Sequence, residues 1–209
     1  TPSNSSAASD VYKRQEIRNA LMNRRIDVDT KLSIFSTYIV GLMKKKQELN
    51  RVDSLFAEML EQYPQEEPVH RLFGMYLSSR KDFSRAEEQY AIAADLAPTN
   101  PENWLQLIGL YLYQEKYAEV IRVGKRAIQY VPDQKDIYMY VAVASAQTKS
   151  YDEALSMLET GLNYVEENDA GTKSFFYGQM GDVYHSAGDK EKSYEMYEKA
   201  LSYLSLIHI

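Results

Sequence analysis

Hydrophobic and polar positions along the chain follow the spacing of amphipathic helices. Between residues 33 and 203, apolar side chains recur three and four residues apart, and no segment alternates strictly between apolar and polar. The first spacing lines one face of a helix, whereas alternation would indicate a strand. The sequence therefore predicts an all-α chain. Paired helices are expected at 33–46 with 49–63, 68–80 with 84–97, 102–114 with 118–131, 136–148 with 152–166, and 173–187 with 191–203.

The stretch Asp95–Trp104, DLAPTNPENW, indicates how neighbouring helices are separated. Pro98 cannot continue the helix before it, because proline has no N–H and its ring clashes with the preceding turn. Asn100 is a favourable N-cap, and Pro101 suits the first helical position. One helix is therefore expected to end and the next to begin within a few residues.

This punctuation recurs with a period of 34 residues, since Pro64, Pro98 and Pro132 fall at one phase. A fixed period of this length is typical of repeat architectures. The chain divides in this register into repeats at 33–66, 67–100, 101–134, 135–168 and, after an insertion at 169–173, 174–207.

Characteristic residues recur at fixed positions within the repeats. Repeat 67–100 has small or aromatic residues at positions 8, 20, 24 and 27, namely Gly74, Ala86, Tyr90 and Ala93. Repeat 101–134 has large apolar residues at positions 4, 7 and 11 and a small one at position 27, namely Trp104, Leu107, Tyr111 and Ala127. The pattern W/Y-x-x-L-G-x-x-Y, A-x-x-x-F/Y-x-x-A and P resembles the tetratricopeptide repeat (TPR) over about residues 33–203. The resemblance implies a right-handed superhelix of antiparallel helix pairs, a TPR α-solenoid.

Some repeats depart from this pattern. Repeat 33–66 has Val40 and Val52 where small residues are expected, so we interpret it as degenerate but helical. Repeat 101–134 also carries larger residues at these positions, and Gly124 at position 24 is expected to offset their volume.

The two ends of the chain are expected to differ from the repeats. Residues 16–32 are interpreted as the remnant helix of a preceding repeat, and residues 1–15 as a non-native, disordered tail. The end segments 10–15 (DVYKRQ) and 204–209 (LSLIHI) resemble translated sequencing-adapter read-through, so 204–209 is also interpreted as a non-native tail. The natural chain is then expected to continue at both ends.

Composition narrows the possible chemistry. The chain is 44% hydrophobic, carries a net charge of −6 and contains no cysteine. Absence of cysteine excludes a disulfide framework and thiolate metal sites, and the negative charge disfavours nucleic acid as a partner. Residues 1–50 carry nine Lys/Arg against five Asp/Glu, whereas the remainder carries 15 against 25. No apolar run approaches the ~20 residues of a membrane-spanning helix.

No catalytic constellation is evident in the sequence. The three histidines are scattered, and the sequence contains neither an HExxH nor a GxGxxG motif. The run Lys44–Lys46 could suggest nucleic-acid binding, but it is better explained as charge at a helix C-terminus. We therefore expect no enzyme activity, cofactor, metal site or nucleic-acid partner.

The TPR resemblance implies a binding surface instead. In that family, positions 2, 5, 9, 12 and 13 of the first helix of each repeat face a concave groove that binds peptides. In the last two repeats these positions hold Asp136, Met139, Val143, Ala146 and Gln147, and Phe175, Gly178, Asp182, His185 and Ser186. The peptide-groove residues predicted here are Arg71, Met75, Leu105, Leu112, Tyr113, Met139 and Val143.

The leading functional hypothesis is a non-catalytic protein–protein interaction scaffold within a larger bacterial protein. It would bind a peptide or a partner helix in the groove. Two alternatives stay open: a targeting or regulatory arm of an enzyme whose catalytic domain lies elsewhere, and a structural spacer without a ligand. The sequence leaves the partner, the oligomeric state and the compartment open, whether cytoplasmic or periplasmic.

Overall fold

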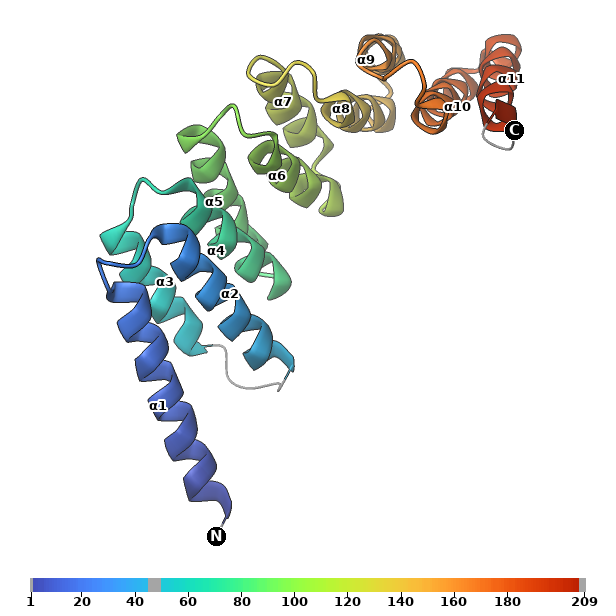
Figure 1. Cartoon of the computed structure of the whole chain (residues 1–209). Helices are drawn as coiled ribbons and strands as arrows, with labels where there is room; N and C mark the ends of the chain where they lie inside the picture. Colours follow the sequence, from blue (N-terminus) through green and yellow to red (C-terminus); the bar gives the residue numbers. More distant parts are fainter. Residues whose placement is uncertain (1, 45–49, 207–209) are drawn as a thin grey trace. The chain divides into compact units, whose positions relative to one another are not determined.

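The structure is a computed structural model that describes residues 2–44 and 50–206, with side chains described for 11–43 and 52–205. Within these residues it consists of eleven α-helices and contains no β-strand (Figure 1). The chain divides into two compact units, Thr1–Leu96 (unit 1) and Ala97–Ile209 (unit 2).

The helices of both units lie close to the predicted ones. Unit 1 contains α1 (Pro2–Met22), α2 (Val28–Lys44), α3 (Asn50–Gln62), α4 (Glu67–Ser79) and α5 (Phe83–Leu96). Unit 2 contains α6 (Pro101–Tyr113), α7 (Tyr117–Ile128), α8 (Lys135–Gln147), α9 (Tyr151–Leu162), α10 (Ala170–Ala187) and α11 (Lys190–Leu206). The ends predicted for the first helix pair, at 46 and 49, lie outside the described residues.

The start of α6 is the one predicted from the sequence. The Asn100 side chain accepts a hydrogen bond from the Glu102 N–H at 3.1 Å, and Pro101 is the first helical residue. Two other helices begin earlier than predicted because an aspartate caps them. Before α2, the Asp27 carboxylate accepts hydrogen bonds from the N–H and the hydroxyl of Thr30, each at 2.8 Å. These two bonds lower the pKa of Asp27. Asp169 caps α10, so most of the predicted insertion 169–173 is helical.

The predicted disordered tail 1–15 is wrong for residues 2–15, which belong to helix α1. The predicted remnant helix is the C-terminal part of the same element. Arg18 Nε donates to Glu58 Oε2 at 2.7 Å, which ties α1 to α3. At the other end, residues 204–206 complete α11, and 207–209 lie outside the described residues.

The recurring prolines have a structural role. At position 4 of three successive repeats, a ring nitrogen or hydroxyl lies within hydrogen-bond distance of the carbonyl of the proline that precedes the helix. The pairs are His70 Nε2 with Pro64 O at 3.1 Å, Trp104 Nε1 with Pro98 O at 2.7 Å, and Tyr138 OH with Pro132 O at 2.9 Å. Each contact fixes the turn between repeats onto the helix that follows.

A left-handed residue follows the first helix of four repeats, at position 15 in each. These residues are Lys81 (φ 62°), Glu115 (φ 56°), Lys149 (φ 62°) and Gly188 (φ 87°). A residue in this conformation lets the chain reverse after a helix, and glycine adopts it without steric cost. In three of the four repeats, a lysine or glutamate therefore adopts a backbone conformation that is less favourable for it than for glycine.

Small residues let the helices approach closely, as the repeat pattern predicts. A Cβ atom on Gly74 would lie 2.6 Å from the Tyr90 ring. A Cβ atom on Gly124 would lie 2.2 Å from Val141 Cγ2, so this glycine admits a side chain of the next repeat. Val40 is 46% exposed, so α2 does not bury its position-8 residue. The buried residues of α2 include Phe35 instead.

Candidate functional site

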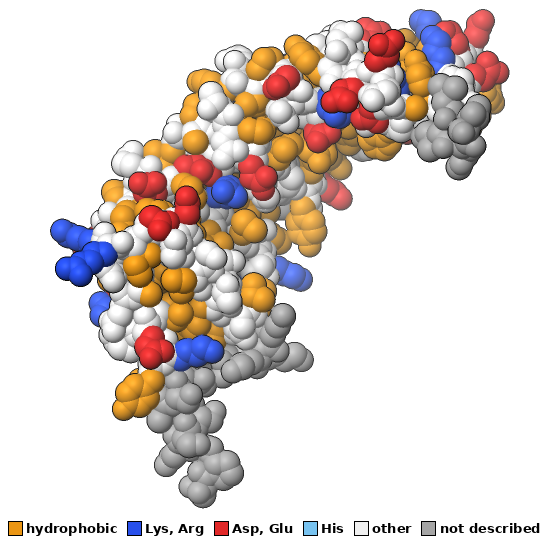
Figure 2. Space-filling view, viewed as in Figure 1, with side chains coloured by type: hydrophobic (Ala, Val, Ile, Leu, Met, Phe, Trp, Pro, Cys, Tyr) orange, Lys and Arg blue, Asp and Glu red, His pale blue; other side chains and the backbone are white. Residues whose placement is uncertain are grey.

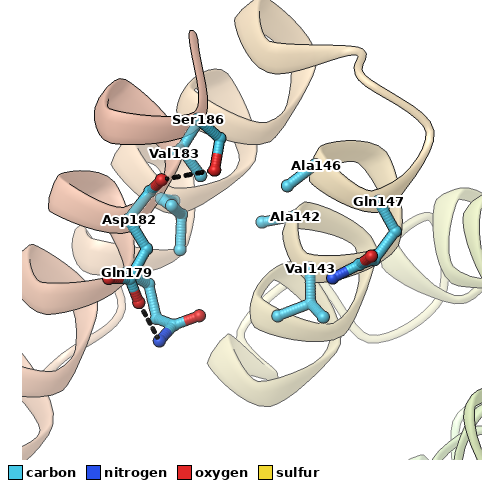
Figure 3. Close-up of a pocket in the computed structure, with 9 residues that line it drawn as sticks. Ala142, Val143, Ala146, Gln147, Gln179, Asp182, Val183 and Ser186 are labelled. Carbon is cyan, nitrogen blue, oxygen red and sulfur yellow. Dashed lines mark hydrogen bonds between the residues drawn. The ribbon is translucent and has the colours of Figure 1, made fainter. Parts of the chain in front are cut away.

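Unit 2 contains a cavity of about 160 Å³ between α8 and α10, with α9 beneath it (Figure 3). We call it the α8–α10 groove. It is lined by Ala142, Val143, Ala146, Gln147, Leu158, Gln179, Asp182, Val183 and Ser186.

The floor of the groove is apolar. Ala142 and Ala146 present only methyl groups toward α10, so space remains between the two helices (Figure 3). Leu158 of α9 and Val183 of α10 belong to the hydrophobic core behind the groove, and Leu158 is fully buried. A small apolar side chain entering here would therefore contact an already packed surface.

The edge of the groove is polar and is organised around Asp182. Its Oδ1 accepts a hydrogen bond from the Tyr197 hydroxyl at 2.7 Å, and its Oδ2 accepts from Gln179 Nε2 at 3.2 Å. The bond to the Asp182 carboxylate raises the pKa of Tyr197, because it stabilises the protonated phenol. Ser186 Oγ donates to the Asp182 main-chain carbonyl at 2.9 Å.

Close packing of α10 against α11 places Tyr197 at this carboxylate. A Cβ atom on Gly181 would lie 2.5 Å from Tyr197 Cε1, so only glycine leaves room for the ring. Tyr197 at position 24 and Gly181 at position 8 therefore have a role besides packing α10 against α11. Together they bring a hydroxyl group to Asp182, 15 residues away in the sequence.

The predicted groove residues of unit 2 are distributed over α6 and α8. Val143 lines the groove, whereas Leu105 and Leu112 are half-buried on α6 and Tyr113 is 69% exposed. Met139 is only 6% exposed and packs in the core with Phe176 and Met180, among others. Met139, although predicted as a groove residue, therefore belongs to the core beneath the surface.

The two predicted residues of unit 1 lie on α4. Met75 is 45% exposed. Arg71 is half-buried, and its Nε donates to Glu67 Oε1 at 2.9 Å on the same helix. This ion pair directs the Arg71 guanidinium along α4.

The structure brings five residues at the predicted groove-facing positions to one cavity: Val143, Ala146, Gln147, Asp182 and Ser186. Four further lining residues occupy other repeat positions and are not predicted from the sequence: Ala142, Leu158, Gln179 and Val183. Ala142 could have been predicted from the sequence, because it is the small residue at position 8 and its short side chain leaves space between successive first helices. No sequence pattern within the repeat predicts the hydrogen bond between Tyr197 and Asp182.

The surface shown in Figure 2 mixes hydrophobic and acidic side chains without a large basic area. Among the described residues, no group of three or more His, Asp or Glu side chains could hold a metal ion. No helix in the described part of the chain is long and apolar enough to cross a membrane.

The fold is shared with solved structures. BtubC (BKLC) from P. vanneervenii is 18% identical, with a TM-score of 0.66 over 96% of this chain and 90% of that one. A MamA protein is 16% identical, with a TM-score of 0.65 over 82% and 91% of the two chains. YrrB, a TPR protein with an unusual peptide-binding site, is 17% identical, with a TM-score of 0.60 over 81% and 84%.

No protein-family model and no curated protein matches the sequence. At these identities, similarity to solved structures establishes the fold alone. The predicted fold class, an all-α solenoid of TPR helix pairs, is confirmed.

Proposed function

We propose that the chain is a non-catalytic protein-interaction scaffold and that unit 2 binds a peptide segment of a partner protein in the α8–α10 groove. The observation that carries this proposal is a cavity with an apolar floor and a polar edge on the first-helix face of two successive repeats. Few polar groups around an apolar surface are typical of ligand sites. The peptide-binding site of YrrB, a protein with a similar fold, is consistent with it.

The size of the groove suggests what enters it. Its volume of about 160 Å³ is close to the ~150 Å³ of an engineered apolar cavity that holds one benzene molecule. The groove would therefore accept one aliphatic side chain of the partner. Removing that side chain from water would supply most of the affinity.

The partner segment is proposed to extend from the groove along α6, which packs against α8. Leu105, Leu112 and Tyr113 would contact it there, and Val143 would contact it within the groove. Met139 would act only by supporting the floor from the core. In unit 1 we propose Arg71 and Met75 as a separate contact surface on α4.

A selection experiment tests the proposal. Peptides are selected on the full chain from a random phage-displayed library, and the affinities of the best are measured by fluorescence anisotropy. Ala146→Gln places a longer, polar side chain over the apolar floor and should weaken binding at least about tenfold. Ala118→Gln, at an exposed position of α7, is the matched control. Equal binding by both variants, or no enriched peptide, would contradict the proposal.

A further inference from the structure

Among the described residues that line the α8–α10 groove, Asp182 alone has a charged side chain. Both of its carboxylate oxygens accept hydrogen bonds from neutral groups, the Tyr197 hydroxyl and the Gln179 amide. Within the described part of the chain, no lysine or arginine forms an ion pair with it. The negative charge at the groove therefore has no internal counter-charge.

The carboxylate is also held in a fixed orientation. Tyr197 is restrained by the packing of its ring against Gly181, and Gln179 lies one helical turn before Asp182. A carboxylate has about four acceptor positions, and these two donors use one on each oxygen. Acceptor capacity remains for an incoming donor, which would meet a side chain that is already ordered.

The charge of unit 2 favours a cationic donor. Its sequence contains ten Lys/Arg against sixteen Asp/Glu, so an approaching anion would be repelled and a cation attracted. Charge-assisted hydrogen bonds to a carboxylate are stronger than neutral ones. A lysine ammonium or an arginine guanidinium satisfies both conditions.

We propose that Asp182 recognises a lysine or arginine of the partner segment, next to the aliphatic side chain that occupies the groove floor. This proposal rests on the proposed function of the same groove and specifies its ligand: an aliphatic residue adjacent to a basic residue. Asp182 contacts the basic side chain directly, and Tyr197 is a positioning residue.

The test compares random heptapeptide libraries selected on the wild-type chain, on Asp182→Asn and on Glu159→Gln. Glu159 is exposed on α9 and outside the groove lining, so its variant removes one negative charge from unit 2 elsewhere. Lysine and arginine beside an aliphatic residue should be enriched on the wild type and on Glu159→Gln. That enrichment should be lost on Asp182→Asn, while the aliphatic preference persists.

Affinities of one selected peptide sharpen the result. Replacing its basic residue by glutamine should weaken binding to the wild type about tenfold, and to Asp182→Asn hardly at all. Tyr197→Phe keeps the ring against Gly181 and removes the hydroxyl. It should weaken the basic peptide several-fold and leave the glutamine peptide unchanged, which a merely structural role would not do.

The outcomes separate the two proposals. An aliphatic preference without basic enrichment would overturn the role of Asp182 and leave the groove assignment intact. Basic enrichment that survives in Asp182→Asn would also overturn it. Peptides that bind equally to the wild type and Ala146→Gln would contradict both the groove and its specificity.

Discussion

The two units of the molecule bury their aromatic residues differently. In unit 2, each repeat stacks its position-4 ring on its position-30 ring, and the centroid distances are 6.0 Å for Trp104–Tyr130, 5.5 Å for Tyr138–Tyr164 and 5.5 Å for Tyr177–Tyr203. Unit 1 has one cluster around Phe56, whose ring lies 4.6 Å from Phe35, 4.4 Å from Phe73 and 5.4 Å from Tyr76.

This difference separates two ways to stabilise helix pairs. In unit 2 each ring pair stays within one repeat and joins its first helix to a residue in or just after its second helix, so the aromatic contacts are local along the chain. In unit 1 the rings come from α2, α3 and α4, so three helices depend on one residue.

The largest expected effect is on the aromatic cluster of unit 1. Phe56 is fully buried, so Phe56→Ala should destabilise the chain by about 3–5 kcal/mol. Tyr164 of unit 2 is 41% exposed, and Tyr164→Ala should cost only about 1 kcal/mol. Urea unfolding measures both changes. Similar costs for the two variants would show that the units do not differ in this way.

A smaller effect is expected where successive helices meet in each unit. Ala93 in unit 1 and Ala127 in unit 2 are both fully buried. Replacing either with phenylalanine should overpack its interface and cost about 1–3 kcal/mol. Hydrogen exchange followed by mass spectrometry should show the faster exchange mainly in the substituted unit. Unchanged exchange and stability for Ala127→Phe would refute the repeat register.

The left-handed residues provide a third comparison. Glu115→Gly in unit 2 and Lys81→Gly in unit 1 relieve the side-chain strain of a positive φ, against a larger entropy loss on folding. Each should stabilise its unit by a few tenths to about 1 kcal/mol, whereas Gly188→Ala should destabilise by a similar amount. Thermal unfolding midpoints report the sign. If Glu115→Gly lowers the unfolding midpoint, the positive φ of Glu115 is not a source of strain.

The smallest effect concerns one ion pair in unit 2. Glu153 pairs with Lys125 and accepts from Ser145 Oγ at 3.1 Å, and these bonds lower its pKa. The ionised carboxylate therefore adds stability that is present at neutral pH and is lost as the pH falls through the folded-state pKa. Glu153→Gln should lower stability slightly at pH 7 and flatten its decline as the pH falls below the ordinary glutamate pKa of about 4.3. If the variant and the wild type lose stability identically as the pH falls, the ion pair between Glu153 and Lys125 does not contribute to stability.

The sequence predicts the fold where the repeat pattern is regular. Trp104 and Tyr138 occupy one repeat position, and both bond to the proline carbonyl six residues before them, so a local rule holds. Repeat 33–66 is less regular: Val40 at position 8 is exposed, and α2 instead buries Phe35 against Phe56 of α3. The assignment of residues 1–15 to a tail rests on the resemblance of residues 10–15 to adapter read-through, which carries no information about helix formation, and residues 2–15 lie in α1.

The candidate site could be predicted only in part. Val143 and Asp182, which the TPR resemblance assigns to groove-facing positions, both line the cavity. The burial of Met139 depends on how closely α10 approaches α8, which no pattern within one repeat specifies. The Tyr197–Asp182 bond likewise depends on packing at Gly181, so the charge recognition proposed for the groove needed the structure.

The most direct test of the central claim is to map a bound peptide onto the chain. A selected aliphatic–basic peptide is titrated into isotope-labelled protein, and backbone amide chemical shifts are followed by NMR. We predict the largest shifts at residues 142–147 and 179–186, with Asp182→Asn reducing them at the same peptide concentration. Shifts confined to α2–α5 or to the exposed face of α11 would contradict binding in the α8–α10 groove.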